Sequence, residues 1–187
     1  MVRTRVGYTG GTTADPSYMN LGDHIETVEI EYDPGRISYQ ELLDVFWASD
    51  TPMVKPYSRQ YAPVIFFHNE EQKRLALESR DRAAARAEGP IYAEVLPAVT
   101  FYQAEDYHQK YWLRHRLSLM KEFRAYYRDD ADLIRSTAAA RVNGYVAGYG
   151  TPEALGSELE SLGLSAEESQ RLMEMVQLAA RRRAALE

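Results

Sequence analysis

The hydrophobic pattern of this 187-residue chain changes its period near residue 115, and this change constrains the fold more than any other feature. Before it, short stretches with a strand pattern alternate with helical patterns. After it, apolar residues recur only at helical spacing. We therefore predict an α+β domain over residues 1–115 and an all-helical extension over residues 116–187. Hydrophobic residues make up 45% of the chain, which is enough for a packed core.

The first part contains start and stop signals for several elements. Ser38 with Glu41 forms a capping box, and Asn69 with Gln72 caps a second helix. The segment from Gly10 down to Gly22 carries Asp15-Pro16-Ser17 and has no periodicity, which predicts a long loop. The expected elements are strands over residues 4–8, 25–32, 64–67 and 91–96, and helices over residues 38–49, 69–87 and 104–115.

The second part reads as a series of helices. We expect one over residues 117–127, one from Asp132 to about residue 148, one that Thr151 caps, and a last helix whose capping box is Ser165 with Glu168. Leu172, Met175 and Val176 form a stripe on this last helix. Because a stripe of this size is rarely left exposed, we expect it to pack on the α+β domain.

Composition excludes several classes of function. The chain has no cysteine, which excludes disulfides, thiolate metal sites and a cysteine nucleophile within these 187 residues. Its formal net charge is −6 and its basic residues are scattered, so nucleic acid is not an expected partner. The longest strongly apolar run, residues 64–67, is far shorter than the roughly 20 residues of a membrane helix. We expect no membrane span and a cytoplasmic location.

Glu26 is the first candidate for chemistry. Alternation places it on the same face of its strand as Val28, Ile30 and Tyr32. If that face points to the core, desolvation would raise the pKa of Glu26 and make it a general acid. The alternative is that Glu26, at the first turn of the strand, leans into solvent. His24 and Glu26 also form a His-x-Glu pair, but without cysteines or suitably spaced histidines they predict no metal site.

Nine short motifs stand out in order along the first part of the chain. They are Gly7-Tyr8-Thr9-Gly10-Gly11, Asp15-Pro16-Ser17-Tyr18, His24-Ile25-Glu26, Asp33-Pro34, Ile37-Ser38-Tyr39, Leu42-Leu43, Phe46-Trp47, Gln60-Tyr61 and Ala104-Glu105-Asp106-Tyr107-His108-Gln109. They follow one another in the order found in peptide methionine sulfoxide reductases of the A type, and on them the chain resembles this family over about residues 2–115. The helical extension lies outside the family's common domain.

The resemblance implies reduction of the S epimer of methionine sulfoxide, free or in proteins, without metal or organic cofactor and with thioredoxin as the partner that supplies electrons. It implies that Tyr18, Glu26 and Tyr61 bind the sulfoxide oxygen, with Glu26 as proton donor. His24, Trp47, Gln60 and His108 match positions that bind the substrate or support the site.

The chain departs from the family pattern at the nucleophile. The family's cysteine belongs to a Gly-Cys-Phe-Trp-Gly motif upstream of the segment that matches Val2 to Tyr8, and this motif is absent. The loop before Gln60 is also shorter, and the family's aspartate there has no clear counterpart. The implied fold is a ferredoxin-like two-layer sandwich without its first strand and helix.

Three hypotheses follow. In the first, the chain begins late in a reductase and the cysteine lies upstream, so that the 187 residues alone are inactive. In the second, the chain is a non-catalytic relative that binds methionine sulfoxide or another small polar ligand. In the third, the helical extension is an interaction module and the α+β part is a scaffold.

Overall fold

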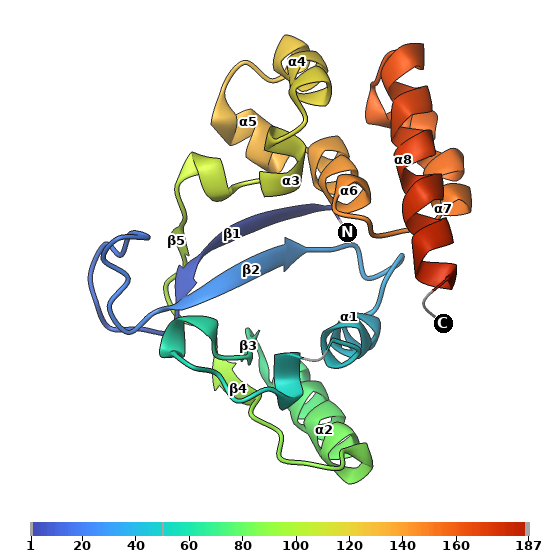
Figure 1. Ribbon diagram of the computed structural model, residues 1–187. Helices are drawn as coiled ribbons and strands as arrows, with labels where there is room; N and C mark the ends of the chain where they lie inside the picture. Colours follow the sequence, from blue (N-terminus) through green and yellow to red (C-terminus); the bar gives the residue numbers. More distant parts are fainter. Residues whose placement is uncertain (1, 50, 186–187) are drawn as a thin grey trace. The chain divides into compact units, whose positions relative to one another are not determined.

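The computed structural model describes residues 2–49 and 51–185 (Figure 1). The chain divides into two compact units. Residues 6–105 form the first, and residues 2–5 with the chain from Asp106 onward form the second. The first unit combines strands and helices, which confirms the expected α+β class. Residues 106–115, which the sequence pattern assigned to the α+β part, group with the helices of the second unit.

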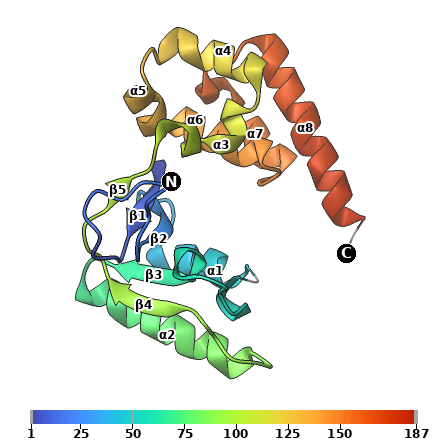
Figure 2. The same cartoon turned by 60° about the vertical axis from the view of Figure 1, so that its left-hand side comes forward.

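The strands form two separate sheets. β1 (Arg3–Thr9), β2 (Ile25–Glu31) and β5 (Tyr102–Gln103) form a three-stranded sheet in the order β2-β1-β5. β3 (Val64–Phe67) and β4 (Glu94–Pro97) form a two-stranded parallel sheet, as Figure 2 shows. A parallel pair needs a crossover, which here contains the long helix α2 (Glu70–Arg86). The outer strands of the two sheets, β2 and β5 in the first and β3 and β4 in the second, each keep one edge that pairs with no strand of the described residues.

Pairing of β1 with β5 depends on a glycine. The two strands are antiparallel, with Gly7 opposite Gln103 and Tyr8 opposite Tyr102. A Cβ atom on residue 7 would lie 2.2 Å from the carbonyl oxygen of Tyr102. Only glycine allows this close approach of the two backbones.

Both predicted helix caps of the first unit are confirmed. α1 (Tyr39–Trp47) begins with a complete capping box, in which the Ser38 hydroxyl accepts from the Glu41 amide and the Glu41 carboxylate accepts from the Ser38 amide. Asn69 accepts from the amide of Gln72 at the start of α2. Leu43 of α1, Ile65 of β3 and Ala76 of α2 form the small core between these elements.

The helix expected over residues 104–115 is not continuous, so this prediction is wrong. A 3-10 turn, η3 (Asp106–His108), is followed by α3 (Tyr111–Arg114), because Lys110 takes a left-handed conformation with φ of 52°. The Lys110 ammonium is buried and donates to the carbonyl and the hydroxyl of Thr4, at 2.5 and 3.0 Å. Burial lowers the pKa of Lys110 to about 8.

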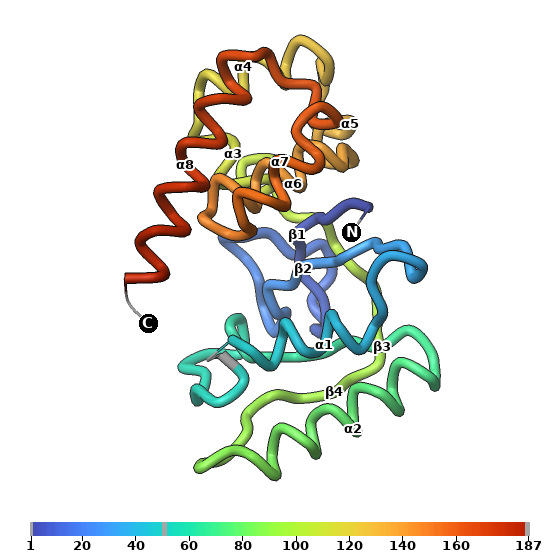
Figure 3. Tube along the Cα trace, turned by 90° about the vertical axis from the view of Figure 1, so that its right-hand side faces the viewer, coloured from blue at the N-terminus to red at the C-terminus, as the bar shows by residue number. Residues whose placement is uncertain are grey.

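The second unit contains five further helices in its described residues, and α8 runs alongside α6 and α7 (Figure 3). The single helix expected from Asp132 is two helices, because Ser136 is extended and caps the second of them with its hydroxyl. Thr151 caps α7, as predicted. The helices are α4 (Leu117–Tyr126), α5 (Asp130–Arg135), α6 (Thr137–Val146), α7 (Pro152–Glu158) and α8 (Ala166–Ala184).

The apolar stripe of α8 is buried, but its predicted partner is wrong. Leu172 and Val176 are 0% and 1% exposed. They belong to a core cluster that the helices of the second unit form among themselves. The sequence-based expectation was that the α+β domain covers them. Phe123 of α4, Leu155 of α7 and Val142 of α6 contribute to this cluster.

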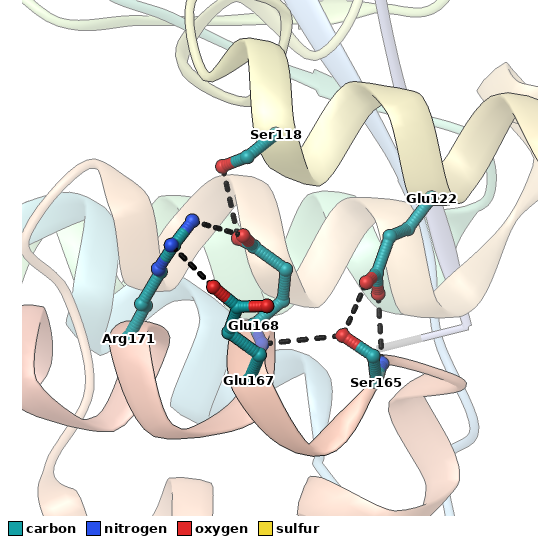
Figure 4. Close-up of polar contacts among 6 residues, drawn as sticks. All are labelled: Ser118, Glu122, Ser165, Glu167, Glu168 and Arg171. Carbon is teal, nitrogen blue, oxygen red and sulfur yellow. Dashed lines mark hydrogen bonds and ion pairs between the residues drawn. The ribbon is translucent and has the colours of Figure 1, made fainter.

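The start of α8 differs from a simple capping box (Figure 4). The Ser165 hydroxyl accepts from the Glu168 amide, as expected. The Ser165 amide, however, donates to Glu122 of α4 at 2.8 Å instead of to Glu168. The Glu168 carboxylate accepts from Ser118 of α4 at 2.9 Å and from Arg171 at 2.8 Å. Side chains thus join α4 to the first turn of α8.

Candidate functional site

The first unit contains a pocket of about 510 Å³. Its walls come from β2, α1 and β3, and most of the lining side chains are apolar, Val28, Leu42 and Phe66 among them. Glu26, Gln60 and Tyr61 also line it and are three of the residues singled out from the sequence.

Glu26 lies on β2 with its side chain exposed, so the alternative that it leans into solvent is correct. The face of β2 that carries Glu26, Val28 and Ile30 is therefore not the core face, and that interpretation is wrong. Val28 and Ile30 are 53% and 38% exposed, whereas Ile25 on the opposite face is 2% exposed. Gln60 donates from Nε2 to the Glu26 carboxylate at 2.7 Å. Gln60 reaches this position because it belongs to a 3-10 turn, η2 (Arg59–Tyr61).

Tyr61 follows Gln60 in the same turn, and its ring contacts that of Tyr57, with centroids 5.0 Å apart. The pKa of Tyr61 is raised, first by a side-chain hydrogen bond with Tyr57, then by desolvation and by the nearby Glu26 charge. Tyr61 is therefore a neutral hydrogen-bond donor at physiological pH. The sequence pattern did not indicate Tyr57. Its position just before the η2 turn, four residues ahead of Tyr61, is the signal that could have indicated it.

Tyr18 belongs to the long loop between β1 and β2 and contributes to the electrostatic environment of Tyr61. Its backbone amide donates to Glu105 at 3.0 Å. The other carboxylate oxygen of Glu105 accepts from the Tyr8 hydroxyl at 2.7 Å. Glu105 therefore attaches the Tyr18 loop to β1. Glu105 belongs to the Ala104–Gln109 motif of the family resemblance, but the sequence alone predicts no role for it.

His24 stabilises the same loop. The side chain is 1% exposed, its Nδ1 accepts from the Gly11 amide, and its Nε2 lies 2.8 Å from the carbonyl oxygen of Thr13. The adjacent Asp23 accepts from the amides and hydroxyls of Thr12 and Thr13, and the hydrogen bonds lower the pKa of Asp23 well below its ordinary value. His24 has no position in the lining of the pocket described here.

The two remaining predicted residues are not among those that line this pocket. The Trp47 indole donates to the Ser79 hydroxyl at 2.9 Å and packs between α1 and α2. His108 belongs to η3 in the second unit. The structure therefore groups Glu26, Gln60 and Tyr61, with Tyr18 nearby, and places Trp47 in the packing of the first unit.

The described residues were also searched for a metal site and for a membrane-spanning helix. Within ranges 2–49 and 51–185, no group of three His, Asp or Glu side chains is placed to hold a metal ion. Across the same ranges, no helix has the length and apolar character needed to cross a membrane.

Comparison with protein families gives two matches. The peptide methionine sulfoxide reductase family matches residues 1–138. The helical domain of selenoprotein methionine sulfoxide reductase A matches residues 128–178. The helical extension is thus itself similar to a domain known from these reductases.

Individual relatives agree with these matches. A peptide methionine sulfoxide reductase of Drosophila melanogaster is 41% identical over 167 residues, which are 88% of this chain and 67% of that protein. Peptide methionine sulfoxide reductase A5 of Arabidopsis thaliana is 40% identical over 79% of this chain and 59% of its own length. The chain thus spans about three fifths to two thirds of these relatives.

A solved structure shows the same fold. The crystal structure of reduced Mxr1 from Saccharomyces cerevisiae aligns with a TM-score of 0.54 and 24% identity, over 58% of this chain and 68% of that one. The family match over residues 1–138 and the 41% identity to the Drosophila melanogaster protein show that the chain belongs to the peptide methionine sulfoxide reductase A family.

Proposed function

We propose that the complete protein reduces the S epimer of methionine sulfoxide, and that Glu26, Tyr61 and Tyr18 bind the sulfoxide oxygen. The observation that carries this proposal is the grouping of Glu26, Gln60 and Tyr61 in one pocket, with a 2.7 Å hydrogen bond from Gln60 to Glu26. Membership of the reductase family supports it.

The residue types suit the reaction. A sulfoxide oxygen carries partial negative charge and gains proton affinity as its bond to sulfur breaks, so neutral donors around it stabilise the transition state. Tyr61 is such a donor, because its raised pKa keeps the phenol protonated. Glu26, when protonated, donates the proton that the oxygen takes up, and Gln60 orients the Glu26 carboxyl group.

The nucleophile has to come from outside these 187 residues, which contain no cysteine. In the net reaction a cysteine thiol takes the oxygen and becomes a sulfenic acid, while the sulfoxide is reduced to the thioether. A second thiol converts the sulfenic acid to a disulfide and releases water, and thioredoxin reduces that disulfide. No hydroxyl group of this chain replaces the thiolate, because attack on sulfur requires a soft nucleophile.

The test compares the 187-residue chain with a version extended upstream through the Cys-Phe-Trp segment that the family resemblance implies. With thioredoxin or dithiothreitol, we expect turnover of the S sulfoxide by the extended chain and none above background by the short chain. In the extended chain, Glu26→Gln should lower kcat by about 100-fold. If the short chain and its Glu26→Gln variant show equal turnover, a contaminating reductase is indicated. If the short chain shows turnover and its Glu26→Gln variant shows none, the requirement for a cysteine is overturned.

The absence of cysteine also favours a second candidate, a relative that binds methionine sulfoxide without reducing it. Titration calorimetry of the 187-residue chain with free S and R methionine sulfoxide addresses it directly. Both candidate functions predict that the chain binds the S epimer and that Tyr61→Phe weakens this binding. The second candidate would be favoured if the extended protein is folded, carries the cysteine and binds the S epimer, but does not reduce it.

A further inference from the structure

Tyr57 lies beside the candidate site but belongs to none of the nine motifs that carry the family resemblance. It directly precedes Ser58, the N-cap of η2, and its side chain is 84% exposed. A ring exposed to this extent contributes little to the packing of the fold, and a single exposed ring needs no explanation by itself. This ring, however, contacts a residue of the candidate site.

The contact joins Tyr57 to Tyr61 in two ways. The ring centroids are 5.0 Å apart and the ring planes are inclined by 37°. A side-chain hydrogen bond also joins the two tyrosines, and it stabilises the neutral phenol of Tyr61. Because Tyr61 is itself 40% exposed, its own surroundings restrict its side chain only in part. Tyr57 therefore helps to fix the Tyr61 phenol through both its ring and its hydroxyl.

The charges around the pocket indicate the form of substrate that fits. Among the described residues that line the pocket with Tyr61 are Glu26 and Glu29, but no lysine or arginine. Arg59, in the same turn as Tyr61, forms an ion pair with Glu94. Free methionine sulfoxide carries an α-carboxylate, which this lining repels and does not neutralise. Within a polypeptide, an uncharged peptide group takes the place of that carboxylate.

A polypeptide substrate also brings neighbouring side chains to the edge of the pocket. Tyr57 is not among the lining residues, but it contacts Tyr61, which is one of them. Consecutive residues of a chain are about 3.8 Å apart, which is similar to the spacing of the two rings. A residue next to the methionine sulfoxide can therefore reach the Tyr57 ring, whose exposed face suits an apolar side chain.

We propose that Tyr57 is a positioning and specificity-determining residue: its hydroxyl holds the Tyr61 phenol in place, and its ring contacts an apolar side chain next to the methionine sulfoxide in a polypeptide. The proposal rests on the proposed function, which places the sulfoxide oxygen at Tyr61. Tyr57 acts on that oxygen only through Tyr61. The effects of its hydroxyl and of its ring are therefore separable.

Tyr57→Phe keeps the ring and removes the hydroxyl, so it tests the positioning role. In calorimetry with the 187-residue chain, we expect free methionine S-sulfoxide and peptides that contain it to bind about fivefold more weakly. In a chain that already carries Tyr61→Phe, Tyr57→Phe should have little further effect, because its hydroxyl acts through the Tyr61 phenol. Equal losses in the two backgrounds, or no loss in either, would overturn the positioning role.

Tyr57→Ala also removes the ring and tests the specificity role. The probes are two acetylated and amidated tripeptides, with methionine S-sulfoxide between two leucines or between two glycines. We expect the chain to bind the leucine peptide about tenfold more tightly than the glycine peptide, because an apolar side chain is covered by the ring. Tyr57→Phe should keep this preference and Tyr57→Ala should abolish it. A preference that survives in Tyr57→Ala, or is absent from the unchanged chain, would overturn the specificity role.

Tyr149→Ala is the matched control. Tyr149 is 73% exposed and belongs to the second unit, so its removal changes the exposed aromatic surface to a similar extent. We expect the affinities for free methionine sulfoxide and for both peptides to stay the same. If Tyr149→Ala abolishes the preference for the leucine peptide, the preference does not depend on the contact between Tyr57 and Tyr61, and the proposal is wrong.

A measurement without substrate separates the proposal from the proposed function. NMR of chains with ¹³C at the tyrosine Cζ follows the titration of Tyr61, whose signal is assigned by its loss in Tyr61→Phe. The pKa of Tyr61 should fall in Tyr57→Phe, because the hydrogen bond that stabilises the neutral phenol is lost. If this shift occurs but the chain binds no sulfoxide, the contact between the tyrosines is supported and the proposed function is wrong. If sulfoxides bind but Tyr57→Phe alters neither the titration nor the affinity, the positioning role is wrong.

Discussion

At the scale of single residues, the site depends on a few side chains that fix other groups in place. Glu105 is the clearest example, because one carboxylate oxygen accepts from the Tyr18 amide and the other from the buried Tyr8 hydroxyl. His24 and Asp23 stabilise other parts of the same loop. The loop is long and irregular, so its conformation depends on such contacts rather than on secondary structure.

Glu105→Ala should therefore loosen Tyr18 without touching the pocket residues on β2. We expect binding of methionine S-sulfoxide to weaken about tenfold, and the free energy of unfolding to fall by about 1–3 kcal/mol because the hydrogen bond from the Tyr8 hydroxyl to Glu105 is lost. Glu105→Gln, which keeps an acceptor oxygen, should restore most of the affinity. Calorimetry measures the first effect and urea unfolding the second. Equal loss of stability in both variants with unchanged affinity would contradict the positioning role.

At the scale of elements, Lys110 interrupts what the sequence suggested was one helix, and its ammonium is buried against Thr4. Its pKa falls from 10.5 to about 8 in the folded chain. Between these values the unfolded chain binds more protons than the folded one, so stability rises with pH.

Between pH 8 and 10 we expect the unfolding free energy to increase by about 2 kcal/mol. Lys110→Met, which cannot ionise, should show a flat profile over this range. Above pH 10 the raised pKa of Tyr145 acts in the opposite direction, because the unfolded phenol ionises first. Denaturant unfolding at intervals of half a pH unit measures both profiles. A slope that persists in Lys110→Met would assign the effect to another group.

The start of α8 is a second element-scale feature. Ser165→Ala removes the N-cap of the helix and the hydroxyl contact with Glu122 of α4. We expect a loss of about 1–2 kcal/mol in unfolding free energy. Because the Ser165 amide still donates to Glu122, the double variant with Glu122→Ala should cost more than Ser165→Ala alone. Thermal and urea unfolding of the single and double variants measure the coupling. Strictly additive losses would show that the two residues act independently.

At the scale of the whole molecule, the two units have separate cores. Leu172 and Leu178 lie on the same helix, α8, but are 0% and 50% exposed. Leu172→Ala should lower the unfolding free energy by about 2–5 kcal/mol, because it leaves a cavity in the helical core. Leu178→Ala should change it by much less. Similar losses in the two variants, measured by urea unfolding, would contradict the burial of this stripe.

The sequence by itself determined the features that depend on neighbouring residues. The caps at Ser38, Asn69 and Thr151 were correct, because each depends on residues two to four positions apart. The order of strands and helices up to β4 and the resemblance to the family were equally readable, and so was the absence of cysteine, which limits the chemistry of the chain. Of the candidate site, the sequence named Glu26, Gln60, Tyr61 and Tyr18.

Only the tertiary structure decided what depends on distant partners. The alternation in β2 could not tell which face is covered, because burial depends on the element that packs there, and Val28 remained exposed. The partner of the α8 stripe and the break at Lys110 were settled by contacts far apart in the chain. The same holds for Glu105, whose two contacts lie 87 and 97 residues away, and for the division of the strands into two sheets, which no local pattern encodes.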